Sequence, residues 1–172
     1  HSESDFGIGI IFAPDAKVLN NTIYSPGSWP YSIEARFSET TNCLIMNNLA
    51  DEDIWGDRDE ASSTLTSNVT DASKDNFADA DSGDLHLSDS SAIAVDQGTA
   101  SEDVSADIDC QSRPVGDLPD VGADEKCVPV AGTGDLDGDC TVTIGDAILA
   151  IQVVVGQEAD VSKDEDMNSD GR

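Results

Sequence analysis

Carboxylates alternate with other residues in segment 135–146, and this spacing is the strongest chemical signal in the chain. A calcium ion takes six to eight oxygen ligands, and a calcium-binding loop of twelve residues supplies them from positions 1, 3, 5, 7, 9 and 12. The acids of the segment stand at positions 1, 3, 5 and 12. The predicted calcium ligands are Asp135, Asp137, Asp139, the carbonyl of Thr141, Thr143 at the water-bridged position, and Asp146.

A second stretch near the end of the given sequence repeats the first part of this pattern. Asp166, Asn168 and Asp170 occupy positions 1, 3 and 5 of a window that stops before its position 12. We expect these three side chains to begin a second calcium site, and whether another chain completes it stays open. In the first loop Cys140 stands where a turn glycine is usual, so the backbone there must be left-handed or the turn must shift.

Apolar residues at helical spacing follow the first loop. Ile148, Ile151 and Val155 fall on one face, and Gly156 suits the C-terminal cap of a helix. The sequence therefore predicts a small loop–helix module whose helix starts where the loop ends.

Residues 5–70 alternate short apolar runs with turns rich in Gly, Pro and Asn, which predicts β-strands. Two runs repeat: 18–23 aligns with 45–49 at an offset of 27, and 8–12 aligns with 33–37 at an offset of 25. Such a period is typical of a solenoid in which each repeat forms one coil and stacked coils share a core.

Asparagine pairs recur at 20–21 and 47–48 within these repeats. At the same corner of successive coils, their amides would form a hydrogen-bonded ladder. Ordinary turn asparagines in a β-sandwich are the alternative interpretation.

The charge balance restricts the possible partners. The chain has 36 acidic and 8 basic residues, for a formal net charge of -28. Nucleic acid and anionic membranes would repel such a surface, and no apolar stretch is long enough to span a bilayer. We therefore expect no nucleic acid and no membrane insertion. The balance favours divalent cations, a cationic partner or a salty habitat.

The four cysteines form no Cys-x-x-Cys motif, so a zinc ribbon, a redox motif and a c-type haem attachment are not indicated. An even count in an acidic, calcium-binding chain suits an oxidising compartment, which predicts a secreted, extracellular or cell-surface protein. Cys43 lies in an apolar run and is predicted to be a buried thiol, although its pairing with Cys140 stays open.

Segment 107–125 resembles the closing tail of a known family. It contains Asp-Ile-Asp-Cys-Gln-Ser-Arg-Pro and then Pro-Asp-Val-Gly-Ala-Asp-Glu. With the preceding repeats, it is similar to the final coils of right-handed parallel β-helices in secreted polysaccharide-active and adhesin-like bacterial or archaeal proteins. The resemblance implies a mainly β fold over residues 1–127, made of the last coils and a closing cap. It also implies that Arg113 pairs with a buried carboxylate of that cap.

Two departures from the family pattern concern cysteines. In the family a glycine usually follows the Asp-x-Asp, and an aromatic residue usually follows the final Glu. Here those neighbourhoods hold Cys110 and Cys127, and the comparison with the family suggests a disulfide between them.

The loop and helix after residue 134 resemble the first half of a dockerin, an EF-hand-like calcium-binding repeat. The resemblance implies a partial dockerin-like module over 135–172, joined to the β-helix by a linker at 128–134. It also implies a cohesin-like protein or a polysaccharide as possible partners.

No arrangement of residues typical of catalysis stands out. His1 and His86 are isolated from Ser or Cys partners, and the lysines and arginines form no recognisable cluster. Acidic runs at 51–53 and 57–60 flank Trp55. They are interpreted as a solvated loop with Trp55 packing down as a lid, with a glycan-binding rim as the alternative.

These observations favour a non-catalytic, calcium-binding structural protein outside the cell. An uncapped coil at one end and a half-formed metal loop at the other predict head-to-tail self-association into a filament or surface matrix. One alternative is the C-terminal portion of a secreted polysaccharide lyase or hydrolase that is attached through a dockerin-type module. A pure attachment device and a fragment of a longer protein also stay open.

Overall fold

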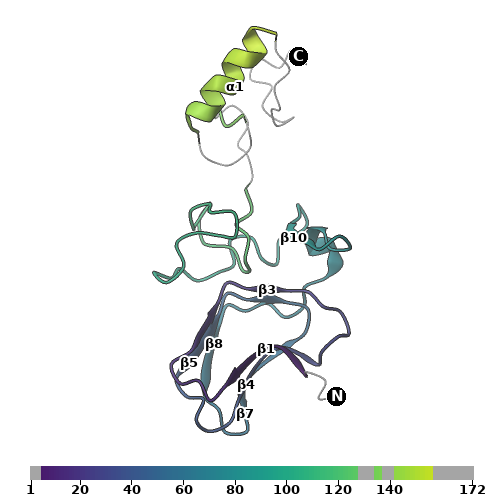
Figure 1. The fold of residues 1–172 in the computed structure, drawn as a ribbon, viewed down its shortest axis with the longest axis vertical. Helices are drawn as coiled ribbons and strands as arrows, with labels where there is room; N and C mark the ends of the chain where they lie inside the picture. The colour runs from purple at the N-terminus through teal and green to yellow at the C-terminus, as the bar shows by residue number, and fades with distance from the viewer. Residues whose placement is uncertain (1–4, 128–133, 137–141, 157–172) are drawn as a thin grey trace. The chain divides into compact units, whose positions relative to one another are not determined.

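The computed structural model describes residues 5–127, 134–136 and 142–156, and the chain divides into two compact units, His1–Lys126 and Cys127–Arg172. Figure 1 shows the elements in chain order. The first unit contains β1 (Phe6–Ile11), β2 (Lys17–Leu19), β3 (Thr22–Ile23), β4 (Tyr31–Arg36), β5 (Cys43–Met46), β6 (Leu49–Ala50), β7 (Asp53–Arg58), β8 (Ser63–Thr66), a 3-10 turn (Lys74–Asn76), β9 (Phe77–Asp79) and β10 (Asp84–Leu87). The second unit contains α1 (Ile144–Val154).

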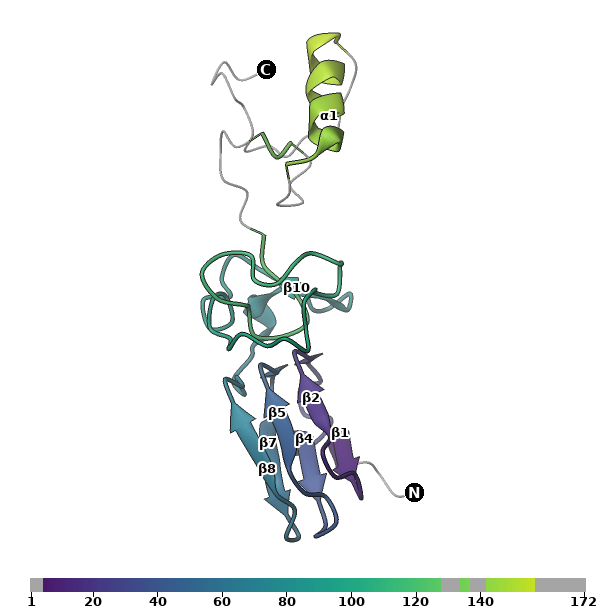
Figure 2. The same ribbon diagram turned by 90° about the vertical axis from the view of Figure 1, so that its left-hand side faces the viewer.

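Three small parallel sheets form the first part of the first unit. Their strand orders are β1-β4-β7, β2-β5-β8 and β3-β6, and Figure 2 shows β2, β5 and β8 next to one another. Ile8 pairs with Ile33, and Val18 pairs with Ile45. The repeat offsets of 25 and 27 residues therefore correspond to real strand pairing.

Apolar side chains from neighbouring strands fill the space between the sheets. Ile33, Ala35 and Ile45 are fully buried there. Burying an isoleucine side chain contributes about 1.5–3 kcal/mol. Cys43 lies in the same cluster as a free thiol, which confirms the prediction of a buried cysteine.

An amide ladder runs along the corner where β2 turns into β3 and β5 turns into β6. Nδ2 of Asn21 donates to Oδ1 of Asn48 at 2.9 Å, and Nδ2 of Asn48 donates to Oδ1 of Asn68 at 2.8 Å. The backbone N–H groups of Asn21 and Asn48 donate to the same oxygens. The ladder predicted from the asparagine pairs is confirmed, and it satisfies polar groups that would otherwise be costly to bury.

The prediction of a right-handed parallel β-helix that continues to a closing cap at residue 127 is wrong. The described residues form short parallel sheets but no solenoid. After β8, Val69 makes only an isolated bridge to Leu49, and β9 pairs with β10 in antiparallel fashion. Residues 88–127 form no strand. This segment is rich in Asp, Ser and Gly and lacks the apolar alternation that a stacked strand needs.

A buried ion pair organises the strandless segment. Arg113 Nη1 lies 2.9 Å from Glu125 Oε1, and both side chains are almost inaccessible to solvent. Arg113 also donates to the carbonyls of Asp120 and Gly122, while Glu125 accepts the N–H of Val115 at 2.8 Å. The prediction that Arg113 pairs with a buried carboxylate is therefore confirmed.

The same segment is fastened to the asparagine corner of the sheets. The N–H of Gly122 donates to the carbonyl of Asn47 at 2.8 Å, and the N–H of Ala123 donates to Oγ1 of Thr22 at 2.9 Å. A loop without a strand ladder thus gains a fixed position from hydrogen bonds to the sheets.

The predicted disulfide between Cys110 and Cys127 is wrong. Cys110 is an exposed free thiol at a turn that Asp107 holds by accepting the N–H groups of Asp109 and Gln111. Cys127 does take part in a disulfide, but its partner is not Cys110. The closing segment is held by the Arg113–Glu125 pair where a crosslink was expected.

The buried ion pair gives a first prediction. Arg113→Met leaves the Glu125 carboxylate buried without its counter-charge, so we expect the free energy of unfolding to fall by about 3–5 kcal/mol. Lys17→Met breaks an exposed pair with Asp103, whose side chains are 51% and 48% exposed, and should change that free energy by no more than about 1 kcal/mol. Urea denaturation followed by circular dichroism measures both, and equal losses would contradict the structural role of Arg113.

Candidate metal centre

The start of α1 is fixed by a reciprocal cap. Thr143 Oγ1 accepts the N–H of Gly145 at 3.0 Å, and Asp146 Oδ2 accepts the N–H of Thr143 at 2.6 Å. Such a capping box satisfies backbone donors that the first helical turn leaves open. The helix therefore begins at Ile144, two residues before the end of the predicted calcium loop.

The carboxylate of Asp146 also connects the two ends of that loop. Its Oδ1 accepts the N–H of Leu136 at 2.7 Å, so one side chain bonds both the segment after Asp135 and the segment before α1. Asp135 is 3% exposed and Asp146 is 2% exposed. Buried carboxylates are unfavourable unless hydrogen bonds or positive charge offset their lost hydration.

Three of the predicted calcium ligands lie in the described part of the chain: Asp135, Thr143 and Asp146. The structure brings the first and last of them to the same end of α1 through the Leu136–Asp146 hydrogen bond. The other predicted ligands lie outside the described residues, namely Asp137, Asp139, Thr141, Asp166, Asn168 and Asp170.

Apolar side chains of α1 remain exposed. Ile144 is 81% exposed and Val154 is 84% exposed, and Ile148 and Ile151 are also accessible. Patches of this kind often mark contact surfaces. The predicted spacing of Ile148 and Ile151 therefore identifies a helix but not a face packed into a core.

A second group of potential ligands lies in the first unit. His86 on β10, Asp109 and Asp124 each offer one ligand atom, and these atoms lie within 4.8 Å of one another. Nδ1 of His86 lies 2.5 Å from Oδ1 of Asp84, and Nε2 lies 2.9 Å from Oδ2 of Asp109. The hydrogen bond to Asp84 raises the pKa of His86, and burial raises the pKa of Asp124.

Sequence reasoning missed this group because its members come from distant segments. His86 has no motif partner, and Asp109 and Asp124 lie in the strandless region. The one local signal was the Asp84-Leu85-His86 run, because residues i and i+2 of a strand point to the same face.

The acidic surroundings of Trp55 form a strand rather than the expected solvated loop. Trp55 lies on β7, its ring centroid 5.1 Å from that of Tyr31 and 4.9 Å from the guanidinium carbon of Arg58. Its Nε1 donates to Asp57 at 3.0 Å. These contacts use part of the indole face that a sugar would stack on.

Comparisons with known proteins return nothing for this chain. No family model matches the sequence, and no curated protein or solved structure matches significantly.

Among the residues that the structure describes, no helix has both the length and the apolar character needed to cross a bilayer.

The segment that carries Asp124 contains a further titrating group. Asp120 is 1% exposed, and burial raises its pKa to about 6, although the N–H groups of Asp96 and Lys126 donate to its carboxylate. An ordinary Asp has a pKa of about 3.9, so the folded state holds this proton more tightly than the unfolded state does.

Stability should therefore depend on pH through Asp120. The stabilisation that the raised pKa of Asp120 provides is fully present below about pH 4 and is lost as the pH rises through about 6. It contributes at most about 3 kcal/mol to the free energy of unfolding. Asp120→Asn does not titrate, so the free energy of unfolding should decline less over this range than in the parent protein. Exposed Asp71→Asn is the control. Parallel pH profiles for all three proteins would contradict the shifted pKa.

Proposed function

We propose that the second unit binds calcium through loop 135–146, and that the protein is a non-catalytic, calcium-stabilised structural protein outside the cell. The observation that carries the proposal is the position of Asp146. Its carboxylate closes the loop on Leu136 and on Thr143, as the last ligand of a twelve-residue calcium loop must do. A carboxylate oxygen has two acceptor sites, so an oxygen that accepts an N–H can also bind a cation.

A role for Asp146 as a helix cap alone does not account for the remaining acids. Capping requires one carboxylate at the third helical position, whereas Asp135 is also buried and Asp137 and Asp139 continue the alternating pattern. Like charges this close in sequence repel one another, and a divalent cation offsets that repulsion. The spacing and the burial together favour a metal loop.

An extracellular setting is supported by the cysteine chemistry and is consistent with the proposed calcium loop. Disulfides such as the one at Cys127 persist mainly in oxidising compartments. Calcium at the concentrations found outside cells can saturate extracellular modules that bind it with only modest affinity.

The loop gives a direct test by isothermal calorimetry with calcium. We expect saturable uptake by the parent protein, with affinity lowered at least about tenfold, or 1.4 kcal/mol, by Asp135→Asn and by Asp146→Asn. Thr143→Ala removes the cap hydroxyl, which costs about 1 kcal/mol of helix stability. Thr143 stands at loop position 9, which often contacts calcium through water, and the carboxylates remain in this variant. The Thr143→Ala protein should therefore retain most of the calcium affinity.

Circular dichroism at helical wavelengths, with calcium and with chelator, completes the test. Calcium should increase the helical signal of the parent protein and of Asp71→Asn but not that of Asp135→Asn. If the parent protein takes up no calcium, or if Asp135→Asn behaves like Asp71→Asn, the calcium proposal is wrong.

Open strand edges support self-association as the way in which a structural role would be carried out. β1 and β7 are the outer strands of one parallel sheet, and β2 and β8 are the outer strands of another. Within the described residues, no further strand pairs with their outward edges. Unpaired edges of this kind can accept a strand from another chain, and contacts that do not close on themselves give filaments.

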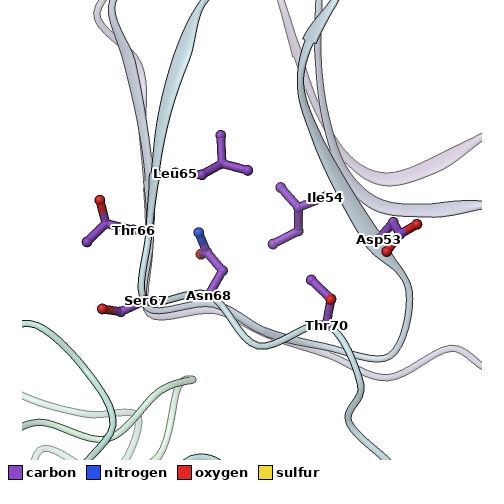
Figure 3. Close-up of a pocket in the computed structure, with 7 residues that line it drawn as sticks. All are labelled: Asp53, Ile54, Leu65, Thr66, Ser67, Asn68 and Thr70. Carbon is purple, nitrogen blue, oxygen red and sulfur yellow. The ribbon is translucent and has the colours of Figure 1, made fainter.

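The β7–β8 side also exposes the end of the apolar core. A hollow of about 280 Å³ lies there, lined by Asp53, Ile54, Leu65, Thr66, Ser67, Asn68 and Thr70. Figure 3 shows Ile54 and Leu65 extending into it from facing strands, and Leu65 is 45% exposed. We propose that β1 of a second copy pairs with the outer edge of β7. Within the chain, β4 pairs with the inner edge of β7.

Leu65→Asp tests this contact, because a charge in the hollow would have to be desolvated when a second copy covers it. Light scattering should show concentration-dependent association of the parent protein at moderate salt, and the loss of this association in Leu65→Asp. Ile108→Asp is the matched control, since Ile108 is a 66% exposed apolar residue outside the hollow. A parent protein that stays monomeric at every concentration and salt level would refute the contact.

A further inference from the structure

We propose that His86, Asp109 and Asp124 form a metal site in the first unit, separate from the calcium loop, that binds a divalent transition metal of the zinc class. The ligand atoms would be Nε2 of His86 and one carboxylate oxygen from each aspartate. These atoms already lie within 4.8 Å of one another.

The orientation of the histidine ring is the first argument. Nδ1 faces Asp84 at 2.5 Å, and Nε2 faces Asp109 at 2.9 Å. A neutral imidazole has a single N–H, so when Nδ1 donates to Asp84, Nε2 presents a lone pair to a carboxylate oxygen. Two lone pairs at this distance need a positive charge between them. A carboxylate behind a histidine is also the usual support of a metal-ligating ring.

The state of Asp124 is the second argument. This residue is 7% exposed, and its Oδ2 accepts the N–H of Leu87 at 2.7 Å. Each carboxylate oxygen has two acceptor sites, so the Asp124 carboxylate retains acceptor capacity for a cation beside this backbone N–H.

The local charge is the third argument. Asp84 and Asp109 lie within hydrogen-bond distance of the His86 ring, and Asp124 offers a ligand atom within 4.8 Å of those of His86 and Asp109. Within the described residues, no lysine or arginine forms an ion pair with any of these three aspartates. A proton on His86 would offset one negative charge, whereas a divalent metal offsets two.

The donor set decides the class of metal. Calcium prefers an all-oxygen shell, whereas one imidazole nitrogen with two carboxylate oxygens suits zinc and its neighbours. At bond lengths of about 2.0–2.2 Å, tetrahedral ligands lie about 3.4 Å apart. Nε2 of His86 and Oδ2 of Asp109, now 2.9 Å apart, would therefore separate slightly, and the ligand atoms of the group are at most 4.8 Å apart. One coordination position would remain for water.

The backbone around these ligands is well supported. The N–H of Ile108 donates to the carbonyl of Ala123 at 2.9 Å, which ties the turn of Asp109 to the segment of Asp124. Oδ2 of Asp107 accepts the N–H of Glu125 at 3.1 Å and strengthens the same connection. The metal would thus bind to a framework that already exists.

Cobalt(II), which substitutes for zinc and absorbs visible light when bound, provides the first measurement. It is titrated into the full chain at physiological ionic strength, with excess calcium present to occupy the loop. We expect a saturable absorption band that zinc displaces. His86→Gln should abolish the band, and Asp109→Asn should weaken metal affinity at least about tenfold. Asp84→Asn should also weaken it, by about 10–100-fold, as outer carboxylate partners of ligating histidines do.

Two matched variants serve as controls. His1→Gln removes the other histidine of the chain, and Asp71→Asn removes an exposed carboxylate. Both should retain the band at unchanged affinity. Urea denaturation confirms that each variant is folded, and zinc-induced shifts of the His86 ring signals in NMR spectra of the parent protein give a readout that needs no variant.

Two results would overturn the proposal. The first is a parent protein that takes up neither cobalt nor zinc, which would show that a proton on His86 is the positive charge between the ring and Asp109. The second is uptake that leaves the His86 signals unmoved and that persists in His86→Gln. That outcome would assign the metal to the diffuse acidic surface.

Discussion

Carboxylates that accept backbone N–H groups hold together the parts of this protein that have no strand ladder. Asp120 accepts from Asp96 and Lys126, Asp124 accepts from Leu87, and Asp146 accepts from Leu136 and Thr143. In a chain with 36 acids and 8 bases, most carboxylates cannot pair with a lysine or an arginine. Backbone donors partly offset the lost hydration of an ionised carboxylate, although burial still raises the pKa of Asp120 and of Asp124.

This solution leaves residual negative charge wherever several carboxylates converge. Around Glu34, Arg36 and Arg58 balance the buried acid, since both arginines lie within ion-pair distance of its carboxylate. Around His86 a single imidazole faces several aspartates, and at loop 135–146 the described residues include two buried acids. The metal site proposed in the first unit is therefore a place where carboxylates outnumber the basic side chains among the described residues.

The regular features of the first unit could be predicted from the sequence because they repeat. The offsets of 25 and 27 residues anticipated the pairing of Ile8 with Ile33 and of Val18 with Ile45, and the asparagine pairs anticipated the amide ladder. The buried thiol of Cys43 followed from its apolar neighbours. Each of these predictions used a local pattern with a definite period.

The irregular features could not be predicted, because side chains rather than periodic backbone pairing determine them. β7 was interpreted as a loop, since its acidic residues hide the alternation that pairs Ile54 with Ile33. The resemblance of segment 107–125 to a closing cap suggested a crosslink at Cys110, yet the turn held by Asp107 leaves that thiol exposed. In the His86 group, the histidine meets aspartates that lie 23 residues or more away in the sequence, which no local pattern records.

The scarcity and the pairing of basic side chains have a consequence for the lifetime of the protein in a protease-rich environment. Trypsin-like enzymes cut after lysine or arginine and need several residues of accessible, extended chain around the cut. The chain has eight lysines and arginines in total. The side chain of Arg113 is only 3% exposed. Arg36 and Arg58 lie within a parallel sheet, and their guanidinium groups form ion pairs with Glu34. Digestion of the folded first unit by such enzymes is therefore restricted to few sites.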